Sequence, residues 1–115
     1  MEGIVVADEG ISGSVTYRDF RAPGRYSSWR KQAFIGSVVV TNIRLVCLMQ
    51  SRFAVDVPFT DERIHKLQMS RERDRLLITL DASLFHDDWS GTIEYRYRTS
   101  QAEEILKWIH ELTQT

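Results

Sequence analysis

The chain has 115 residues, a formal net charge of −1, 43% hydrophobic residues and 27% charged residues. A chain of this length and composition is expected to fold as one globular domain with its own hydrophobic core. The nearly balanced charge excludes a general attraction to nucleic acid or membranes, so binding to either would need a local basic patch. No apolar run approaches the roughly 20 residues that a membrane-spanning helix needs.

The single cysteine and the start of the chain bear on the cellular compartment. Cys47 lies in the apolar run of residues 45–49, where we expect a buried thiol, and one cysteine cannot form an intrachain disulfide. Residues 1–9 lack the basic segment and the long apolar run of a signal peptide. Both features predict a cytoplasmic protein, which could still lie at the membrane periphery.

Residues 1–12 give no clear pattern. Residues 4–6 are apolar enough for a short strand, but glycines bracket them and Asp8-Glu9 interrupts the run. We therefore interpret residues 1–12 as an N-terminal arm, which is a short strand on another strand's edge or a frayed end. Residues 13–115 form the domain itself.

Alternation of apolar and polar residues, interrupted by turn residues, predicts seven short strands. Pro23-Gly24 forms the first turn, and residues 25–32 follow as a long loop or a ragged strand start. Gly36 is a candidate β-bulge, and Pro58 ends the fourth strand because proline has no N–H to donate. The expected strands are residues 14–18, 34–41, 44–49, 53–57, 64–70, 76–81 and 92–98.

A helix over about residues 100–113 follows the last strand directly. Ser100 and Glu103 have the spacing of a capping box, in which each side chain bonds the other residue's backbone N–H. Trp108 lies at the rim of the apolar stripe, so it either closes the helix onto the sheet or anchors a protein partner or a second copy of the chain. The stripe itself consists of Ala102, Ile105, Leu106, Ile109 and Leu112.

These elements predict a mainly β fold, a seven-stranded antiparallel partly open barrel or sandwich, with the C-terminal helix plugging one opening. Four strands, a crossing, three strands and a helix over residues 13–113 resemble the pleckstrin homology (PH) superfold. Residues 36–45, with a glycine, an apolar strand and the hairpin sequence TNIRL, are similar to a motif of GRAM and bacterial PH-like domains. In that hairpin Asn42 suits the turn, and the Thr41 hydroxyl can bond the turn backbone. The resemblance implies a shape and no particular ligand.

A local excess of positive charge lies between the first two strands. Residues 18–31 carry five cations and one carboxylate, Asp19, which gives a net charge of +4. The resemblance implies that this loop is where phosphoinositide-binding relatives place their basic residues, although Gln32 stands where a second basic residue should follow Arg30. The loops after the third and sixth strands are expected at the same mouth, where the carboxylates of His86-Asp87-Asp88 would weaken an anion site. The candidate anion-binding residues are Arg18, Arg21, Arg25, Arg30, Lys31 and Arg52.

Aromatic residues are interleaved with these cations. Phe20, Tyr26 and Trp29 could serve as stacking platforms for single-stranded nucleic acid, but the chain lacks the overall basic character of such proteins. Trp29 is therefore taken, together with Trp108, as a candidate interface residue.

Residues suited to catalysis or metal binding are not grouped along the sequence. His86, Asp87 and Asp88 are adjacent, but without a fourth partner they are better interpreted as a solvated acidic turn than as metal ligands. The serines have no Ser-His-Asp context, and the thiol lies in an apolar run. We therefore expect a protein that is not an enzyme and that uses no metal, cofactor or small-molecule substrate.

We interpret the chain as a non-catalytic binding module of PH-like type, whose expected task is protein–protein interaction or self-association. The first alternative is binding to the anionic head groups of a membrane surface through the basic loop. The second alternative, which the net charge disfavours, is binding to single-stranded nucleic acid.

Overall fold

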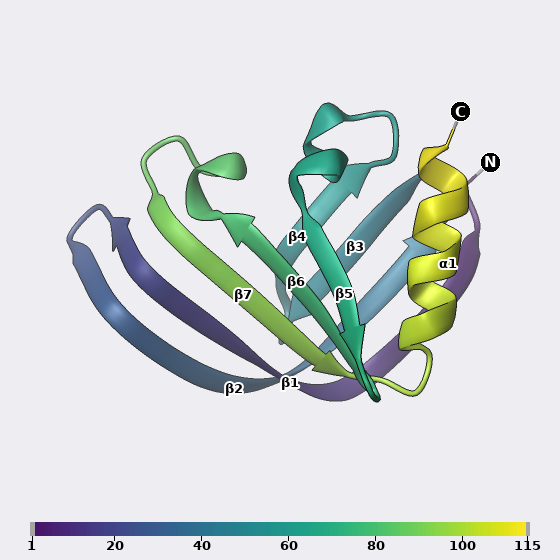
Figure 1. The fold of residues 1–115 in the computed structure, drawn as a ribbon, viewed down its shortest axis with the longest axis horizontal. Helices are drawn as coiled ribbons and strands as arrows, with labels where there is room; N and C mark the ends of the chain where they lie inside the picture. Colours follow the sequence, from purple (N-terminus) through teal and green to yellow (C-terminus); the bar gives the residue numbers. More distant parts are fainter. Residues whose placement is uncertain (1, 115) are drawn as a thin grey trace.

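A computed structural model describes residues 2–114 as one strongly curved antiparallel sheet followed by a C-terminal helix (Figure 1). The prediction of a mainly β fold with seven strands and one helix is confirmed. Along the sheet the strands follow the order β4-β3-β2-β1-β7-β6-β5, so β1 lies at the centre. The elements are β1 (Ile4–Ala22), β2 (Arg25–Thr41), β3 (Arg44–Met49), β4 (Arg52–Pro58), the 3₁₀-helix η1 (Glu62–Lys66), β5 (Gln68–Glu72), β6 (Arg75–Asp81), the 3₁₀-helix η2 (Ala82–Leu84), β7 (Ser90–Arg98) and α1 (Ala102–Thr113).

β1 and β2 form a hairpin of 19 and 17 residues, much longer than the other strands. β1 pairs with β2 along most of its length and with β7 over its second half, and residues 4–12 belong to this strand. The expected loop at residues 25–32 is wrong, because this stretch is the first half of β2. Nearly every residue there is exposed on both faces, so the sequence lacks the alternation that marks a half-buried strand.

Two glycines in the hairpin have different structural roles. The register slips between Asp8 and Ile11, where Gly10 has a φ of +65° and an extra residue enters β1. Gly36 was expected as the bulge, but it lies in β2, opposite Ile11, so that expectation is wrong. A Cβ at Gly36 would instead collide with the Leu48 carbonyl oxygen, which explains why this position needs glycine.

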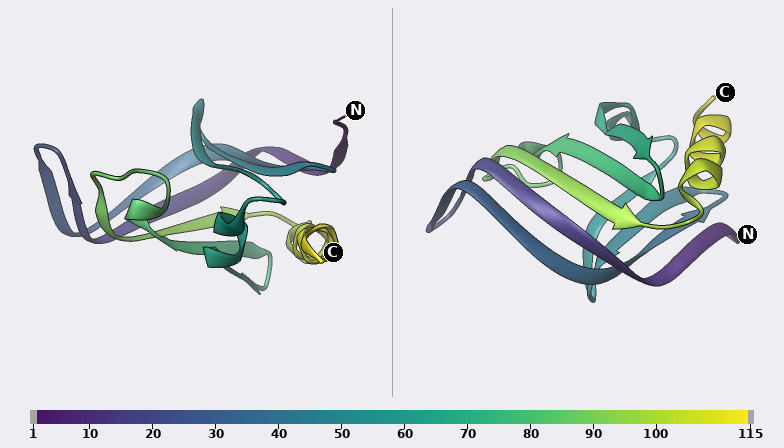
Figure 2. Two further views of the ribbon diagram at one scale, coloured as in Figure 1. Left: turned by 90° about the horizontal axis from the view of Figure 1, so that it is seen from above. Right: turned by 60° about the horizontal axis from the view of Figure 1, so that its bottom comes forward.

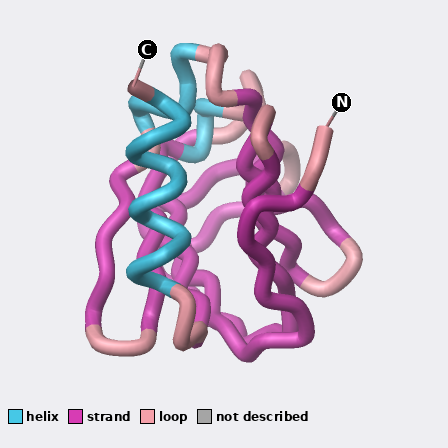
Figure 3. The backbone as a smooth tube through the Cα atoms, turned by 90° about the vertical axis from the view of Figure 1, so that its right-hand side faces the viewer, coloured by secondary structure: helices cyan, strands magenta, loops and turns pink. Residues whose placement is uncertain are grey.

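The inner face of the sheet and one face of α1 enclose the core. Tyr97 of β7 has 0% exposed surface, and its ring lies edge-on to Phe34 at a centroid distance of 5.3 Å. Its hydroxyl donates a hydrogen bond to the Leu48 carbonyl oxygen at 3.1 Å. α1 covers one end of the curved sheet, where it contacts β1 and β5 and buries Ile105 and Ile109 (Figure 3). The predicted apolar stripe is therefore the packing face of the helix.

The start of α1 differs from the expected capping box, which is wrong. The residue that precedes the helix is Gln101, and its side chain makes no capping bond. Thr99, two residues before this N-cap, orders the approach to the helix instead: its hydroxyl accepts a hydrogen bond from the Gln101 N–H at 3.1 Å and donates one to the Asp8 carboxylate at 2.6 Å. Ser100 is exposed. The buried Thr99 therefore ties the helix start to β1, a long-range contact that no local spacing encodes.

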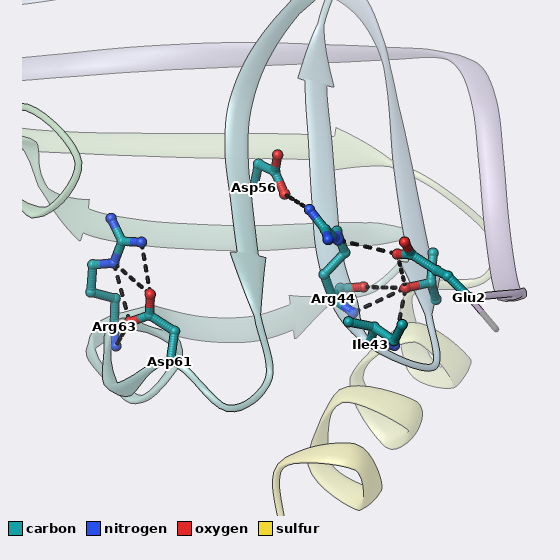
Figure 4. Close-up of polar contacts among 7 residues, drawn as sticks. Glu2, Ile43, Arg44, Asp56, Asp61 and Arg63 are labelled. Atoms are coloured by element: carbon teal, nitrogen blue, oxygen red, sulfur yellow. Dashed lines mark hydrogen bonds and ion pairs between the residues drawn. The ribbon is translucent and has the colours of Figure 1, made fainter.

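The connection between β4 and β5 contains η1 in place of the expected start of the fifth strand. Ile64 lies in η1, so its assignment to a strand is wrong, although its side chain is buried as its apolar character suggests. Asp61 begins η1 by accepting a hydrogen bond from the Arg63 N–H at 2.9 Å, and it also pairs with the Arg63 guanidinium at 2.7 Å (Figure 4). The short polar residue at this N-cap position favours a helical turn over a strand.

The turn between β2 and β3 anchors the start of the chain. The Thr41 hydroxyl accepts hydrogen bonds from the N–H groups of Ile43 and Arg44, so the predicted bond from this side chain to the turn backbone is confirmed. Arg44 forms ion pairs with Glu2 at 3.1 Å and with Asp56 of β4 at 3.5 Å (Figure 4). These contacts hold residue 2 beside the sheet at the end of the molecule that α1 covers.

Candidate binding surface on the projecting hairpin

The far part of the β1–β2 hairpin projects away from the rest of the sheet. We call residues 18–31 the projecting hairpin; Figure 2 shows its tip and α1 at opposite ends of the molecule. β7 covers the β1 side as far as Arg21, but β3 pairs with β2 only from Gly36 onward. Within residues 2–114, no strand pairs with the outer edge of residues 25–34, which we call the β2 edge. An edge of this kind presents unpaired backbone donors and acceptors.

An aromatic cluster packs against one face of the projecting hairpin. Phe20 is 2% exposed, and its ring lies 4.9 Å from Tyr17 and 5.2 Å from Trp89, measured between centroids. Trp89 comes from the connection between β6 and β7 and is itself stacked on His86 at 3.6 Å. The expectation that Phe20 offers a stacking platform is therefore wrong, because its ring is enclosed by protein.

Four of the predicted cations surround the tip of the hairpin with few charge partners. The Arg21 guanidinium lies 4.8 Å from the centre of the Tyr26 ring, and that of Arg25 lies 6.0 Å from the Phe20 ring, both within the range of cation–π attraction. Arg30 forms no ion pair with any residue from 2 to 114. Arg18 differs from these three, because it pairs with Glu94 of β7 at 3.4 Å.

Arg52 lies apart from these cations. It stands at the β3–β4 turn beside Met49, which in turn pairs with Gly36 of β2. From Gly36 to Arg25 the chain runs eleven residues along β2, roughly 35 Å in an extended strand. The expected mouth that combines Arg25, Arg30 and Arg52 is therefore not formed. The connection between β6 and β7, which carries Asp87, packs against the projecting hairpin through Trp89.

The two tryptophans taken as interface candidates have different surroundings. Trp29 is 61% exposed on the projecting hairpin, opposite Arg18, and Tyr26 beside it is 58% exposed. Trp108 is partly buried and packs against the core on the flank of α1. Trp29 is thus available to a partner, whereas most of the Trp108 ring serves the packing of the helix.

The outer face of the sheet holds further cations that the sequence reading did not single out. Arg96 and Arg98 of β7 point to this face beside Ser14, and Arg75 of β6 lies opposite Arg98. The signal that could have identified them is their register, since residues that pair directly across antiparallel strands point to the same face. That register depends on which strands are neighbours, and the sequence alone does not give this.

The remaining chemical candidates stay separate in the fold. Cys47 is buried as predicted, and burial raises the pKa of its thiol far above its usual range, so it carries no nucleophilic thiolate. Across residues 2–114, no three His, Cys, Asp or Glu side chains come close enough to share a metal ion. The same residues contain no helix with the length and apolar character needed to cross a membrane.

Comparison with known proteins gives no relative whose function could be compared with this surface. The sequence matches no family model, and no curated protein matches it.

Proposed function

We propose that the chain is a non-catalytic, PH-like module that binds a partner protein by adding an acidic extended segment to the β2 edge. The observation that carries this proposal is the β2 edge itself, a long exposed strand edge with cations and exposed aromatic side chains on it. In strand addition, backbone hydrogen bonds supply affinity, and the side chains that alternate along the edge supply specificity.

The length of the β2 edge separates it from the two outermost strands of the sheet. β4 and β5 have seven and five residues, short edges of the kind that proteins tolerate without covering. The β2 edge spans residues 25–34 and continues a strand that is fully paired further along. A segment of similar length could therefore extend the sheet without any rearrangement of the domain.

Charge favours an acidic partner over a second copy of the chain. Residues 18–31 have a net charge of +4, and the cations on the β2 edge itself are Arg25, Arg30 and Lys31. Two copies paired along this edge would bring like charges together, which opposes pairing. Arg30 and Lys31 are adjacent and point to opposite faces, so a partner strand with Glu or Asp at alternate positions would place its carboxylates beside one of them, while Trp29 and Tyr26 offer apolar contact.

The strand order and the single helix support the PH-like part of the proposal. The order β4-β3-β2-β1-β7-β6-β5, with one helix over an end of the curved sheet, agrees with the four strands, three strands and helix on which the resemblance rests. The buried thiol of Cys47 supports a cytoplasmic location.

The test uses a blocked eight-residue peptide of alternating Glu and Val, with a Lys and Val peptide as its control. We expect the acidic peptide to shift the NMR signals of residues 25–34 and the basic peptide to leave them unchanged. The double variant Arg25→Glu/Arg30→Glu should weaken binding by about tenfold or more, since it reverses the charge of the edge.

The matched control is Arg52→Glu, which reverses an exposed arginine at the β3–β4 turn, away from Arg25 and Arg30, and should change affinity less than about twofold. Equal binding of the basic peptide, or equal loss in the Arg52→Glu variant, would contradict the proposal. A dimer in light scattering that dissociates in the Arg25→Glu/Arg30→Glu variant would also contradict it and would assign the edge to self-association.

A further inference from the structure

A groove crosses the outer face of the sheet at the middle of β1. Its volume is about 210 Å³. Residues 12–14 of β1 form the floor, and four cationic side chains from three other strands form the walls. The lining residues are Ser12, Gly13, Ser14, Lys31, Arg75, Arg96 and Arg98.

The groove follows from the length of the side chains on neighbouring strands. Ser14 pairs with Arg96 on β7, so these two side chains point to the same outer face. On the other side of β1, Lys31 of β2 pairs with Thr16, which lies two residues after Ser14 and on the same face. Short serine side chains on the central strand between long cationic side chains on both sides leave a hollow with positive walls.

Two of the wall cations, Lys31 and Arg75, form no ion pair with any residue between 2 and 114, although Arg75 lies near enough to Asp74 to contribute to the lowered pKa of that carboxyl. The hydroxyls of Ser12 and Ser14 likewise have no hydrogen-bond partner among these residues. The groove thus presents an ammonium group, a guanidinium group and two hydroxyls to whatever enters it.

The other two wall cations are held in place by carboxylates. The Arg96 Nε donates to Glu94 Oε1 at 2.7 Å, and the Arg98 Nε donates to Asp74 Oδ2 at 3.2 Å. Both contacts use Nε, so the terminal N–H groups of each guanidinium stay available to a second acceptor. The hydrogen bond with Glu94 also raises the pKa of Arg96. The carboxylates near the groove are Glu72, Asp74 and Glu94, fewer than the four cations that line it.

We propose that this groove binds a phosphate group, on its own or as the head group of a phosphorylated lipid or inositol. Every polar side chain that lines it can donate a hydrogen bond, and guanidinium groups match the geometry of phosphate oxygens. A single short groove suits one compact anion better than a polynucleotide, which needs a continuous basic track. This inference shares Lys31 with the β2 edge, but the other three cations of the groove, Arg75, Arg96 and Arg98, lie on β6 and β7 and take no part in that edge.

The test is an NMR titration with inorganic phosphate at constant ionic strength, with chloride as the balancing anion. We expect saturable shifts of the amide signals of residues 12–14. The double variant Lys31→Gln/Arg75→Gln should weaken binding by about tenfold or more, because it removes the two unpaired charges. Arg52→Gln, which removes an exposed arginine elsewhere, should change affinity less than about twofold.

A second pair of variants separates a shaped site from diffuse attraction. Ser14→Val fills the floor of the groove without changing any charge, and it should abolish the saturable shifts; Ser28→Val on the projecting hairpin should leave them intact. Ser14→Ala serves as a further check, since it removes the hydroxyl with little effect on folding. Phosphate shifts that do not saturate, or that persist in both Lys31→Gln/Arg75→Gln and Ser14→Val, would overturn the proposal.

Two arms identify the source of the phosphate. Inositol 1,4,5-trisphosphate tests a soluble ligand, and phosphatidylcholine vesicles that contain phosphatidylinositol 4,5-bisphosphate test a membrane. Ile35 and Phe53, which are 57% and 68% exposed, lie on the same outer face beyond the groove and would contact lipid in the second case. Recruitment to vesicles that falls in Phe53→Ser while soluble binding persists supports a membrane source. Soluble binding without recruitment supports a free ligand. Saturable binding of inorganic phosphate with neither of these supports a lone phosphate group, and no saturable binding of any of the three would overturn the proposal.

Discussion

The two halves of the β1–β2 hairpin share one pair of strands but have opposite environments. In the half near α1, Val15, Phe34, Val38 and Val40 are buried in the core. In the projecting hairpin, Phe20 is the buried residue, and the charged and aromatic side chains around it are exposed. One continuous element thus contributes to stability at one end and presents a surface at the other.

Strand length and strand burial are therefore separate properties of this hairpin. The projecting hairpin keeps its strand structure through pairing with β7 and through the contact of Phe20 with Trp89, without a core of its own. Substitutions on its surface should therefore alter binding with little effect on folding, whereas substitutions near α1 should do the reverse.

The largest expected effect is in the half near the helix, at Tyr97. Tyr97→Ala should lower the free energy of unfolding by about 3–5 kcal/mol, because it empties the centre of the core and leaves the Leu48 carbonyl oxygen without its donor. Tyr97→Phe keeps the ring and should cost about 1 kcal/mol. Urea unfolding of both variants measures the difference, and equal losses would show that the core is not centred on this ring.

The same substitution at the two tryptophans compares the two regions directly. Trp108→Gln should cost about 2 kcal/mol, because the partly buried ring packs against the core. Trp29→Gln should change stability by less than about 0.5 kcal/mol, since most of its ring is exposed. A large loss of stability for Trp29→Gln would contradict the division of the hairpin into two regions.

Thr99→Ala should destabilise the protein by about 1–2 kcal/mol, because it removes the bond to the Gln101 N–H and leaves the Asp8 carboxylate without its donor. Ser100→Ala is the matched control, since Ser100 is exposed and the expected capping box is not formed. Thermal unfolding checks this pair. A larger loss of stability in the Ser100→Ala variant would show that Ser100 caps the helix after all.

The smallest expected effect concerns pH and Asp61. Its side-chain hydrogen bond with Arg63 lowers the pKa of this carboxyl below its usual value, so the ion pair stabilises the folded state above the unfolded pKa of about 3.9. This contribution is lost as the pH falls through the folded pKa. Asp61→Asn should therefore be less stable than the unmodified protein near pH 6, with a gap that closes near pH 2. A gap independent of pH would rule out the ion pair as its cause.

Sequence patterns identified the elements that bury one face. The alternation of Ile93, Tyr95 and Tyr97 in β7 and the stripe of α1 both gave the correct element, because each pattern reflects burial against a single core. The same logic failed at residues 25–32, where exposure on both faces leaves no alternation to detect. It also failed at Thr99, whose hydroxyl donates to Asp8, 91 positions away in the chain.

The candidate site was predictable only in part, for the same physical reason. The charge excess of residues 18–31 is a local property and could be counted, so the cations of the projecting hairpin were found. The separation of Arg52 from that hairpin and the meeting of Lys31 with Arg75 and Arg96 depend on strand order and register. These are long-range properties that no local spacing carries.

Amide hydrogen exchange along β2, with and without the acidic peptide, shows whether the β2 edge is unpaired in the free protein and takes up a strand. In the free protein, alternate amides of residues 25–34 should exchange rapidly because they face the unpaired edge, while those of residues 36–40, which pair on both sides, exchange slowly. The peptide should slow the rapid set and leave the others unchanged. Complete protection of residues 25–34 in the free protein would show that the edge is already covered, and no added protection with the peptide would rule out strand addition.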